Sequence, residues 1–201
     1  MNEQGDCNLA KSSQSLVCSL TGVAIIGLLT VTTVSPTAAQ VIPDNSLGNT
    51  PSVVNTQDGQ NILIEGGTRN YGNLFHSFQN FNVNNGQQVF FANPEGVSNI
   101  ITRVTGNNSS NINGVLGVSG LANLFLINPQ GIIFGADSKL DVKGSFIAST
   151  AESLNFSDGS FFSAVQPKSI PLLQVNVPIG LQYGANPAPI QVQQANLQVK
   201  P

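Results

Sequence analysis

The stretch NINGVLGVSGLANLFLINPQGIIFG, residues 111–135, holds short apolar runs that are separated by sharp polar corners rich in Gly and Asn. The run at 124–127, Leu-Phe-Leu-Ile, is continuously apolar, which is typical of a strand that is covered on more than one side. Short strands with sharp corners favour a parallel β-helix, a coil in which each turn stacks on the one before it. A β-sandwich stays open as an alternative from this pattern alone.

The same pattern continues on both sides of this stretch. After residue 40 no apolar period of 3.6 residues is sustained over three turns, so we expect little helix. The predicted strands are 53–56, 62–65, 88–92, 99–104, 112–118, 123–127, 132–134, 140–142, 146–148 and 154–156. Asn tolerates left-handed backbone at corners, and stacked Asn side chains can hydrogen-bond along the coil, so we also expect Asn ladders.

Two corners have the same form, Asn-Pro-x-Gly, at 93–96 and 128–131. Each tetrad favours a type I turn, because Asn suits the first position, Pro the second and Gly the fourth. Each follows an apolar strand and precedes a β-branched residue. Two similar β-turns without a further role would explain the tetrads equally well. The candidate site residues at these corners are Asn93, Pro94, Gly96, Asn128, Pro129, Gly131 and Ile132.

Composition limits the classes of function. Of the 201 residues only 8% are charged, with 7 Lys+Arg against 10 Asp+Glu, so the chain lacks the clustered basic charge of a nucleic-acid-binding protein. Hydrophobic residues make up 40% and the net charge is −3, which excludes the composition of a disordered chain. We predict a folded protein without a nucleic-acid partner.

Residues 15–35, SLVCSLTGVAIIGLLTVTTVS, are uncharged and are followed by Pro36 and the small residues of Thr-Ala-Ala at 37–39. This layout predicts a signal peptide, 1–39, that is cleaved between Ala39 and Gln40. An uncleaved membrane anchor is the alternative, because about 20 apolar residues can span a bilayer. Both cysteines precede residue 40, so the mature chain has none. The predicted domains are a β-helix at 40–166 and a Pro/Gln-rich tail, or the start of further turns, at 167–201.

Three segments together resemble a known family: NPEGVSNIITRVTG at 93–106, residues 111–135, and LDVKGSFIAST at 140–150. They are similar to the two-partner secretion domain, or haemagglutination activity domain, of filamentous-haemagglutinin-like exoproteins. The Asn-Pro-x-Gly-Ile sequence at 128–132 resembles the best-known motif of that family. Glu95 and Gln130 depart from it, because the family often has a second Asn there. The similarity runs from about residue 41 to 156.

The resemblance implies a right-handed, single-stranded parallel β-helix with capping strands at its N-terminal end. It also implies a function in type V secretion. The general secretion machinery would carry the chain into the periplasm, where an outer-membrane β-barrel transporter with periplasmic polypeptide-binding domains would recognise it. The β-helix would then fold outside the cell, secreted or at the cell surface, and the Asn-Pro corners would be the recognition residues. Family members usually continue into long repeats that carry the effector activity.

The alternative function is a surface adhesin or glycan-binding module with a host-cell or glycan ligand. A β-helix lyase has less support, because Asp137 and Asp141 are the closest pair of acids in the mature chain and lie beside two lysines. His76 is the only histidine, and the mature chain has no Cys, so we predict no metal site, no cofactor and no enzyme. The aromatic residues Phe75, Phe78, Phe81, Phe90 and Phe91 indicate a packed core, or else a surface for the transporter.

Overall fold

The structure is a computed structural model that describes residues 41–168, 178–195, 197 and 198. The predicted signal peptide, its cleavage site at Ala39 and Gln40, and both cysteines lie outside the described residues. In the described part of the chain we find strands and turns, and no membrane-spanning helix.

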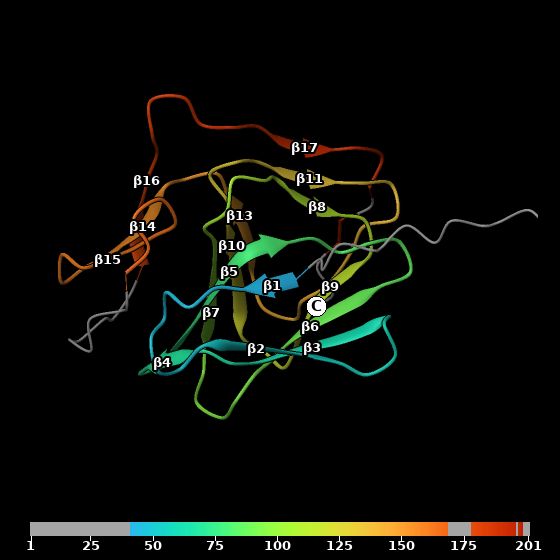
Figure 1. Ribbon diagram of the computed structural model, residues 1–201, viewed down its shortest axis with the longest axis horizontal. Coiled ribbons are helices and arrows are strands. Elements are labelled where there is room, and N and C mark those ends of the chain that lie inside the picture. Colours follow the sequence, from blue (N-terminus) through green and yellow to red (C-terminus); the bar gives the residue numbers. More distant parts are fainter. Residues whose placement is uncertain (1–40, 169–177, 196, 199–201) are drawn as a thin grey trace, which may run out of the picture. The chain divides into compact units, whose positions relative to one another are not determined.

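Three parallel sheets form the wall of a coil (Figure 1). Sheet B stacks β3 (Asn61–Gly66), β6 (Gln88–Ala92), β9 (Val115–Ser119) and β12 (Lys139–Asp141). Sheet A stacks β5 (Asn73–Phe81), β7 (Asn99–Val104), β10 (Asn123–Ile127) and β13 (Phe146–Ser149). Sheet C stacks β8 (Ser110–Ile112), β11 (Ile132–Phe134) and β17 (Ile190–Val192). The chain visits sheets B, A and C in turn, which makes a parallel β-helix of about three turns and confirms the predicted fold class.

The turns of the coil have nearly equal lengths. In sheets A and B, residues that are aligned on neighbouring parallel strands are 22 to 27 positions apart in the sequence. Such parallel crossovers are right-handed in almost all proteins, which is the physical reason to expect a right-handed coil. The predicted strands at 88–92, 99–104, 123–127 and 132–134 have the bounds of β6, β7, β10 and β11.

Antiparallel strands cap the N-terminal end of the coil. β1 (Val41–Pro43) and β4 (Thr68–Asn70) pair with β5, and β2 (Ser52–Thr56) pairs with β3. These pairings satisfy backbone groups that the first turn would otherwise leave as an open sheet edge. The predicted capping strands are therefore confirmed.

A small antiparallel sheet, sheet D, covers the outer side of sheet A. It consists of β14 (Ser153–Phe156), β15 (Phe161–Ser163) and β16 (Pro178–Gln182), which lie on the left of Figure 1. The chain leaves the coil after β13, forms sheet D, and returns with β17 beside β11. The stretch from 167 onward, predicted as a tail or as further turns, thus supplies β16 to sheet D and β17 to the coil.

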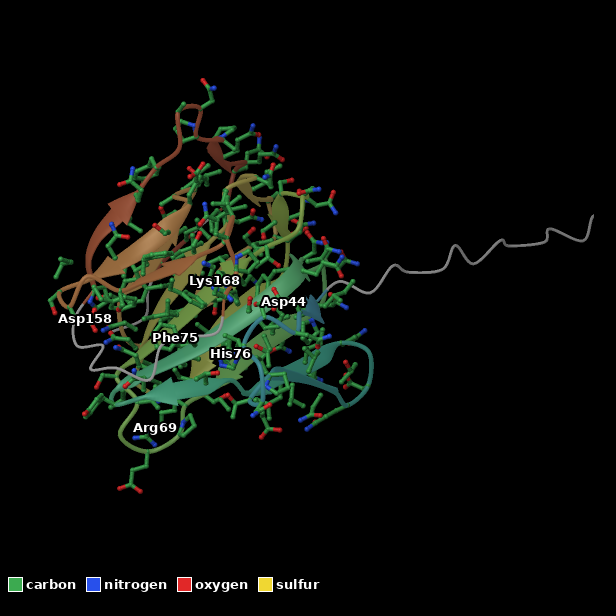
Figure 2. All side chains as sticks on the ribbon, turned by 60° about the vertical axis from the view of Figure 1, so that its left-hand side comes forward. Asp44, Arg69, Phe75, His76, Asp158 and Lys168 are labelled. Carbon is green, nitrogen blue, oxygen red and sulfur yellow. The ribbon has the colours of Figure 1, made fainter. Side chains whose placement is uncertain are left out.

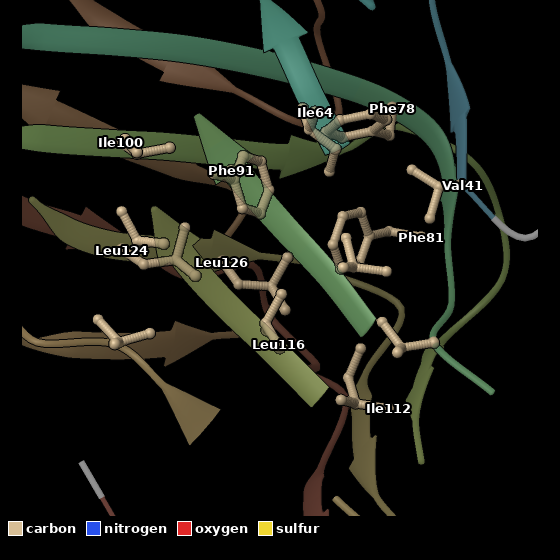
Figure 3. Packing of buried hydrophobic residues seen from close by; sticks show 14 of the residues in the cluster. Val41, Ile64, Phe78, Phe81, Phe91, Ile100, Ile112, Leu116, Leu124 and Leu126 are labelled. Atoms are coloured by element: carbon tan, nitrogen blue, oxygen red, sulfur yellow. The ribbon is translucent and has the colours of Figure 1, made fainter. Parts of the chain in front are cut away.

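Two apolar clusters result from these layers. The inner cluster fills the coil and includes Phe78, Phe91, Ile100 and Leu124 (Figure 3). The second cluster lies between sheets A and D and joins Phe75, Ile101 and Ile127 to Leu154, Phe156 and Phe162. Both faces of sheet A are therefore buried, which explains the continuous apolar run of β10. Four of the five noted aromatic residues, Phe75, Phe78, Phe81 and Phe91, are core residues rather than a surface.

The strand predicted at 112–118 is wrong in its extent, because a corner at Asn113-Gly114 divides it into β8 and β9. At this corner the backbone of one turn comes very close to the turn before it. A Cβ atom on Gly114 would lie 2.3 Å from the carbonyl oxygen of Asn84 and 2.4 Å from that of Gln87. Only glycine fits here, because backbone on the neighbouring turn cannot move away alone.

We therefore expect Gly114→Ala to lower the free energy of unfolding by about 2–3 kcal/mol. Chemical denaturation of the purified domain would measure it. Gly180→Ala is the matched control, because a Cβ there meets nothing within 4 Å, and its effect should stay within about 0.5 kcal/mol. Equal effects of the two substitutions would contradict the close approach.

Candidate functional site

The first Asn-Pro corner joins β6 to β7 and is partly exposed. The Oδ1 atom of Asn93 accepts hydrogen bonds from the backbone N–H groups of Leu121, at 2.9 Å, and Ala122, at 3.0 Å. Its Nδ2 group donates to the carbonyl of Val97 at 3.0 Å. Asn93 thus holds its own turn and also the corner of the next turn of the coil. Pro94 and Gly96 of the same tetrad are exposed, and Gly96 has a φ of 76°.

The second Asn-Pro corner joins β10 to β11, and its Asn128 is 0% exposed. The Nδ2 group of Asn128 donates to the carbonyl of Asn108 and to the hydroxyl of Ser110, both at 3.0 Å. Its Oδ1 atom accepts the N–H of Gln130 at 2.9 Å. Asn128 therefore holds its own turn and the corner of the preceding turn.

After Asn128 the chain passes from the second corner into the buried strand β11. Pro129 is half-buried, and Gly131 is buried with a φ of 108°, a conformation that favours glycine. Ile132 follows and is 0% exposed in the inner cluster. The two corners are thus alike in sequence, and the second is the more buried of the two. Neither is only an isolated turn, because each Asn binds a neighbouring turn of the coil.

A third Asn-Pro corner, which the sequence analysis missed, precedes β17. Asn186-Pro187-Ala188-Pro189-Ile190 has the same Asn-Pro-x-x-Ile spacing as 128–132, and Ile190 lies in register with Ile132. The N–H of Ile132 donates to the carbonyl of Pro189 at 3.3 Å. The repeated spacing could have revealed this corner. Asn186 itself is exposed, unlike Asn128.

The expected Asn ladder lies at the start of the sheet A strands. Asn73, Asn99 and Asn123 are in register on β5, β7 and β10. The Nδ2 groups of Asn99 and Asn123 each donate to the Oδ1 atom of the Asn on the preceding turn, Asn73 and Asn99 respectively, both at 2.9 Å. The ladder confirms the prediction and ties three turns of the coil together.

Arg103 was not among the predicted site residues, and it is 1% exposed on the outer side of β7. Its Nε group donates to Ser77 Oγ at 2.8 Å, and its Nη2 group donates to Ser46 Oγ at 2.7 Å. Two backbone carbonyls also accept its hydrogen bonds, that of Ser163 at 2.9 Å and that of Lys168 at 3.1 Å. Burial lowers the pKa of Arg103 to about 10, which leaves the guanidinium charged at neutral pH.

Asp44 supplies the negative charge of this network. Ser77 Oγ donates to one carboxylate oxygen at 2.8 Å, and Thr105 Oγ1 donates to the same oxygen at 2.6 Å. Ser46 Oγ donates to the other oxygen at 2.5 Å. Burial raises the pKa of Asp44, but the hydrogen bonds from Ser46, Thr105 and Ser77 outweigh it and hold the pKa below its usual value. Figure 2 labels Asp44, whose carboxylate belongs to this network, and Lys168, whose backbone carbonyl accepts from Arg103.

His76 points into the coil. It is 0% exposed, and its Nδ1 atom lies 3.1 Å from Ser52 Oγ. Its Nε2 atom and the hydroxyl of Thr102, the residue in register on β7, have no hydrogen-bond partner among the described residues. Burial lowers the pKa of His76 to about 3, so the ring is neutral at neutral pH.

We expect this burial to make the domain less stable in mild acid. The unfolded chain binds a proton at His76 near pH 6.5 and the folded chain only near pH 3, so stability falls as the pH drops through this window. From pH 7 to pH 5 the loss should be about 2 kcal/mol. Urea unfolding at the two pH values measures it, and His76→Gln should remove most of the difference. An unchanged pH dependence in that variant would refute the assignment.

Of the two acids considered for catalysis, Asp137 is exposed and Asp141 is half-buried. Asp137 Oδ2 accepts a hydrogen bond from Asn85 at 2.7 Å on an exposed corner. In the part of the chain that the structure describes, no group of three His, Cys, Asp or Glu side chains could hold a metal ion.

Residues 39–201 match the family model of the TPS secretion domain, where TPS stands for two-partner secretion. Among solved structures, the crystal structure of the filamentous hemagglutinin secretion domain is similar, with 23% identity and a TM-score of 0.48. The match covers 57% of this chain and 43% of that chain, so this chain spans less than half of that structure. Curated proteins gave no match.

Proposed function

The chain belongs to the TPS secretion domain family, which assigns it a secretion-targeting role, and from this premise we propose that an outer-membrane transporter recognises it in an unfolded state. The transporter is a β-barrel with periplasmic polypeptide-binding domains, reached through the general secretion machinery. Folding into the β-helix then follows outside the cell. This proposal includes the domain boundaries at 39/40 and 166/167. It also includes the Asn-Pro corners as recognition residues.

The burial of the second Asn-Pro corner carries the proposal. Asn128, Gly131 and Ile132 are closed to any partner in the folded domain, and both sides of the Asn128 amide are already hydrogen-bonded. A transporter that reads this motif must therefore meet the chain before the coil forms. The exposed tetrad at 93–96 could be read in either state.

The fold suits assembly from an extended chain. Each turn of the coil adds burial and backbone hydrogen bonds to the turn before it, so folding can advance turn by turn and supply a free-energy gradient. The sequence after residue 40 has no cysteine, so no disulfide can lock the chain before it is transported. These properties favour export in an extended state.

The test is secretion of residues 1–201 with and without a co-expressed two-partner transporter, compared in medium and periplasm. We expect export to depend on the transporter and to fail in Asn128→Ala. Asn186→Ala is the matched control, because it changes an exposed Asn in the same Asn-Pro context, and it should be exported normally. Retention of the unchanged chain in the periplasm beside an exported known exoprotein would overturn the proposal.

A stability measurement separates recognition from folding. Asn128→Ala leaves the carbonyl of Asn108 and the N–H of Gln130 without this partner, which should cost about 1–3 kcal/mol. If a purified, refolded Asn128→Ala domain is stable but is not exported, the amide acts in recognition. If Asn128→Ala and Gly114→Ala lose export in proportion to stability, the corner acts only through folding.

One surface favours the second candidate function, a glycan-binding module. On the outer side of sheet B, a hollow of about 210 Å³ is lined by Gln57, Asn61, Ile62, Leu63, Gln88, Phe90 and Ser119. The ring of Phe90 lies over Gly117, where a Cβ would come within 2.4 Å of it. A flat aromatic ring among neutral amides suits stacking and hydrogen bonding with an uncharged sugar.

Binding of the folded chain to an array of neutral oligosaccharides would test this second function. Phe90→Ala should abolish binding, and Phe161→Ala, which removes an exposed ring from sheet D, should leave it unchanged. No binding, or equal binding by both variants, would exclude the hollow as a sugar site.

A further inference from the structure

We infer that Arg103 joins the N-terminal cap and the outer sheet D into one cooperative unit, so that neither can open without the other. The segments that contact the guanidinium run from Ser46, just after β1, to Lys168, and sheet D adds β16 to the unit. This inference concerns the folded domain alone and goes beyond the proposed targeting function.

Several distant chain segments meet at the side chain of Arg103. The acceptors for Arg103 are Ser46, Ser77, Ser163 and Lys168, at sequence separations of 57, 26, 60 and 65 residues from it. They belong to the segment after β1, to β5, to β15 and to the stretch after β15. The desolvation cost of a buried guanidinium is offset only when its hydrogen bonds are made, so it requires all these segments at once.

Two serine hydroxyls link the positive charge of Arg103 to the negative charge of Asp44. Ser46 and Ser77 each accept a hydrogen bond from Arg103 and donate one to Asp44. Their hydroxyl protons are therefore oriented toward the carboxylate whenever Arg103 is present. The cap supplies the only carboxylate in this described network, and without it the guanidinium would be a buried charge with no counter-ion.

Sheet D covers the guanidinium of Arg103. The guanidinium of Arg103 lies 4.1 Å from the centre of the Phe162 ring, a cation–π contact, and Phe162 meets Phe75 edge-on at 5.0 Å. Sheet D thus excludes water from Arg103. Docking of sheet D without the cap would bury an uncompensated charge, and closure of the cap without sheet D would leave two guanidinium bonds unmade. The two events are therefore favourable together.

Hydrogen exchange of the full chain, read by mass spectrometry, tests this coupling. The perturbation is Phe156→Leu, which loosens sheet D through its packing on Phe75 at 5.8 Å and leaves the groups that bind Arg103 in place. The readout is the protection of amides at 41–45 in the cap. We expect this substitution to lower that protection about tenfold in the natural background and less than about twofold in the Arg103→Met background.

Two controls keep the result interpretable. Phe161→Leu changes the neighbouring exposed ring of sheet D and should not alter protection at 41–45. Arg69→Met removes an exposed arginine and should leave the coupling at its natural value. Unchanged cap protection in Phe156→Leu, or an equal loss in the natural and the Arg103→Met backgrounds, would overturn the inference.

Discussion

Arg103→Ala is expected to lower the free energy of unfolding by about 3–5 kcal/mol, because removing one partner of a buried charge network leaves the other without compensation. Asp44 would keep its burial and lose the opposing cation. The carbonyls of Ser163 and Lys168 would lose a donor, and the space under Phe162 would be left unfilled. Arg103→Lys should recover little of this loss, since one ammonium cannot reproduce the planar fork of a guanidinium.

Guanidinium chloride unfolding of the purified domain at neutral pH measures this effect. Arg69→Ala is the comparison, because Arg69 is exposed and donates only to the carbonyl of Tyr71 among the described contacts. Its substitution should change stability by about 0.5 kcal/mol or less. A loss below about 1 kcal/mol for Arg103→Ala would show that the network contributes little to stability.

Phe91→Ala should have an effect of similar size, about 3–5 kcal/mol, through a different cause. Phe91 is fully buried in the coil, with its ring centre 5.9 Å from Phe81, 6.4 Å from Phe78 and 5.3 Å from His76. Truncation removes these ring contacts and leaves a cavity between the first two turns. The stacked strands on both sides prevent the wall from closing around it.

The same unfolding experiment with Phe161→Ala supplies the matched comparison for the ring. Phe161 is 51% exposed on sheet D, so its loss should cost about 1 kcal/mol or less. If Phe91→Ala were as mild as this control, the interior of the coil would have to be loosely packed at its first turns.

The coil could be predicted from the sequence where strands repeat the same apolar pattern. β6, β7, β10 and β11 were found with their bounds because each run ends at a corner that contains Gly, Asn or Pro. β5, the longest strand, was missed although it holds the aromatic residues. Both of its faces are buried and it mixes His76, Ser77 and Gln79 with rings, so it shows no alternation between a polar and an apolar face.

The parts that sequence could not reveal depend on contacts between distant residues. Asp44 and Arg103 lie far apart in the chain, and nothing local pairs them. One signal was present: Arg103 is the only charged residue between Glu95 and Asp137, and it lies inside an apolar strand. Such an isolated charge indicates a buried partner. The position of β17 was likewise not predictable. The chain reaches β17 only after sheet D, and nothing local pairs it with β11.

That late return of β17 has a kinetic consequence. Parallel pairs in sheets A and B close loops of 22 to 27 residues, whereas Ile132 and Ile190 close one of 58. The longer loop adds somewhat less than about 1 kcal/mol of chain entropy to that single pairing. A nascent domain should therefore pair the strands of sheets A and B before it adds β17, which makes the seam between β11 and β17 the last of these parallel pairings to form.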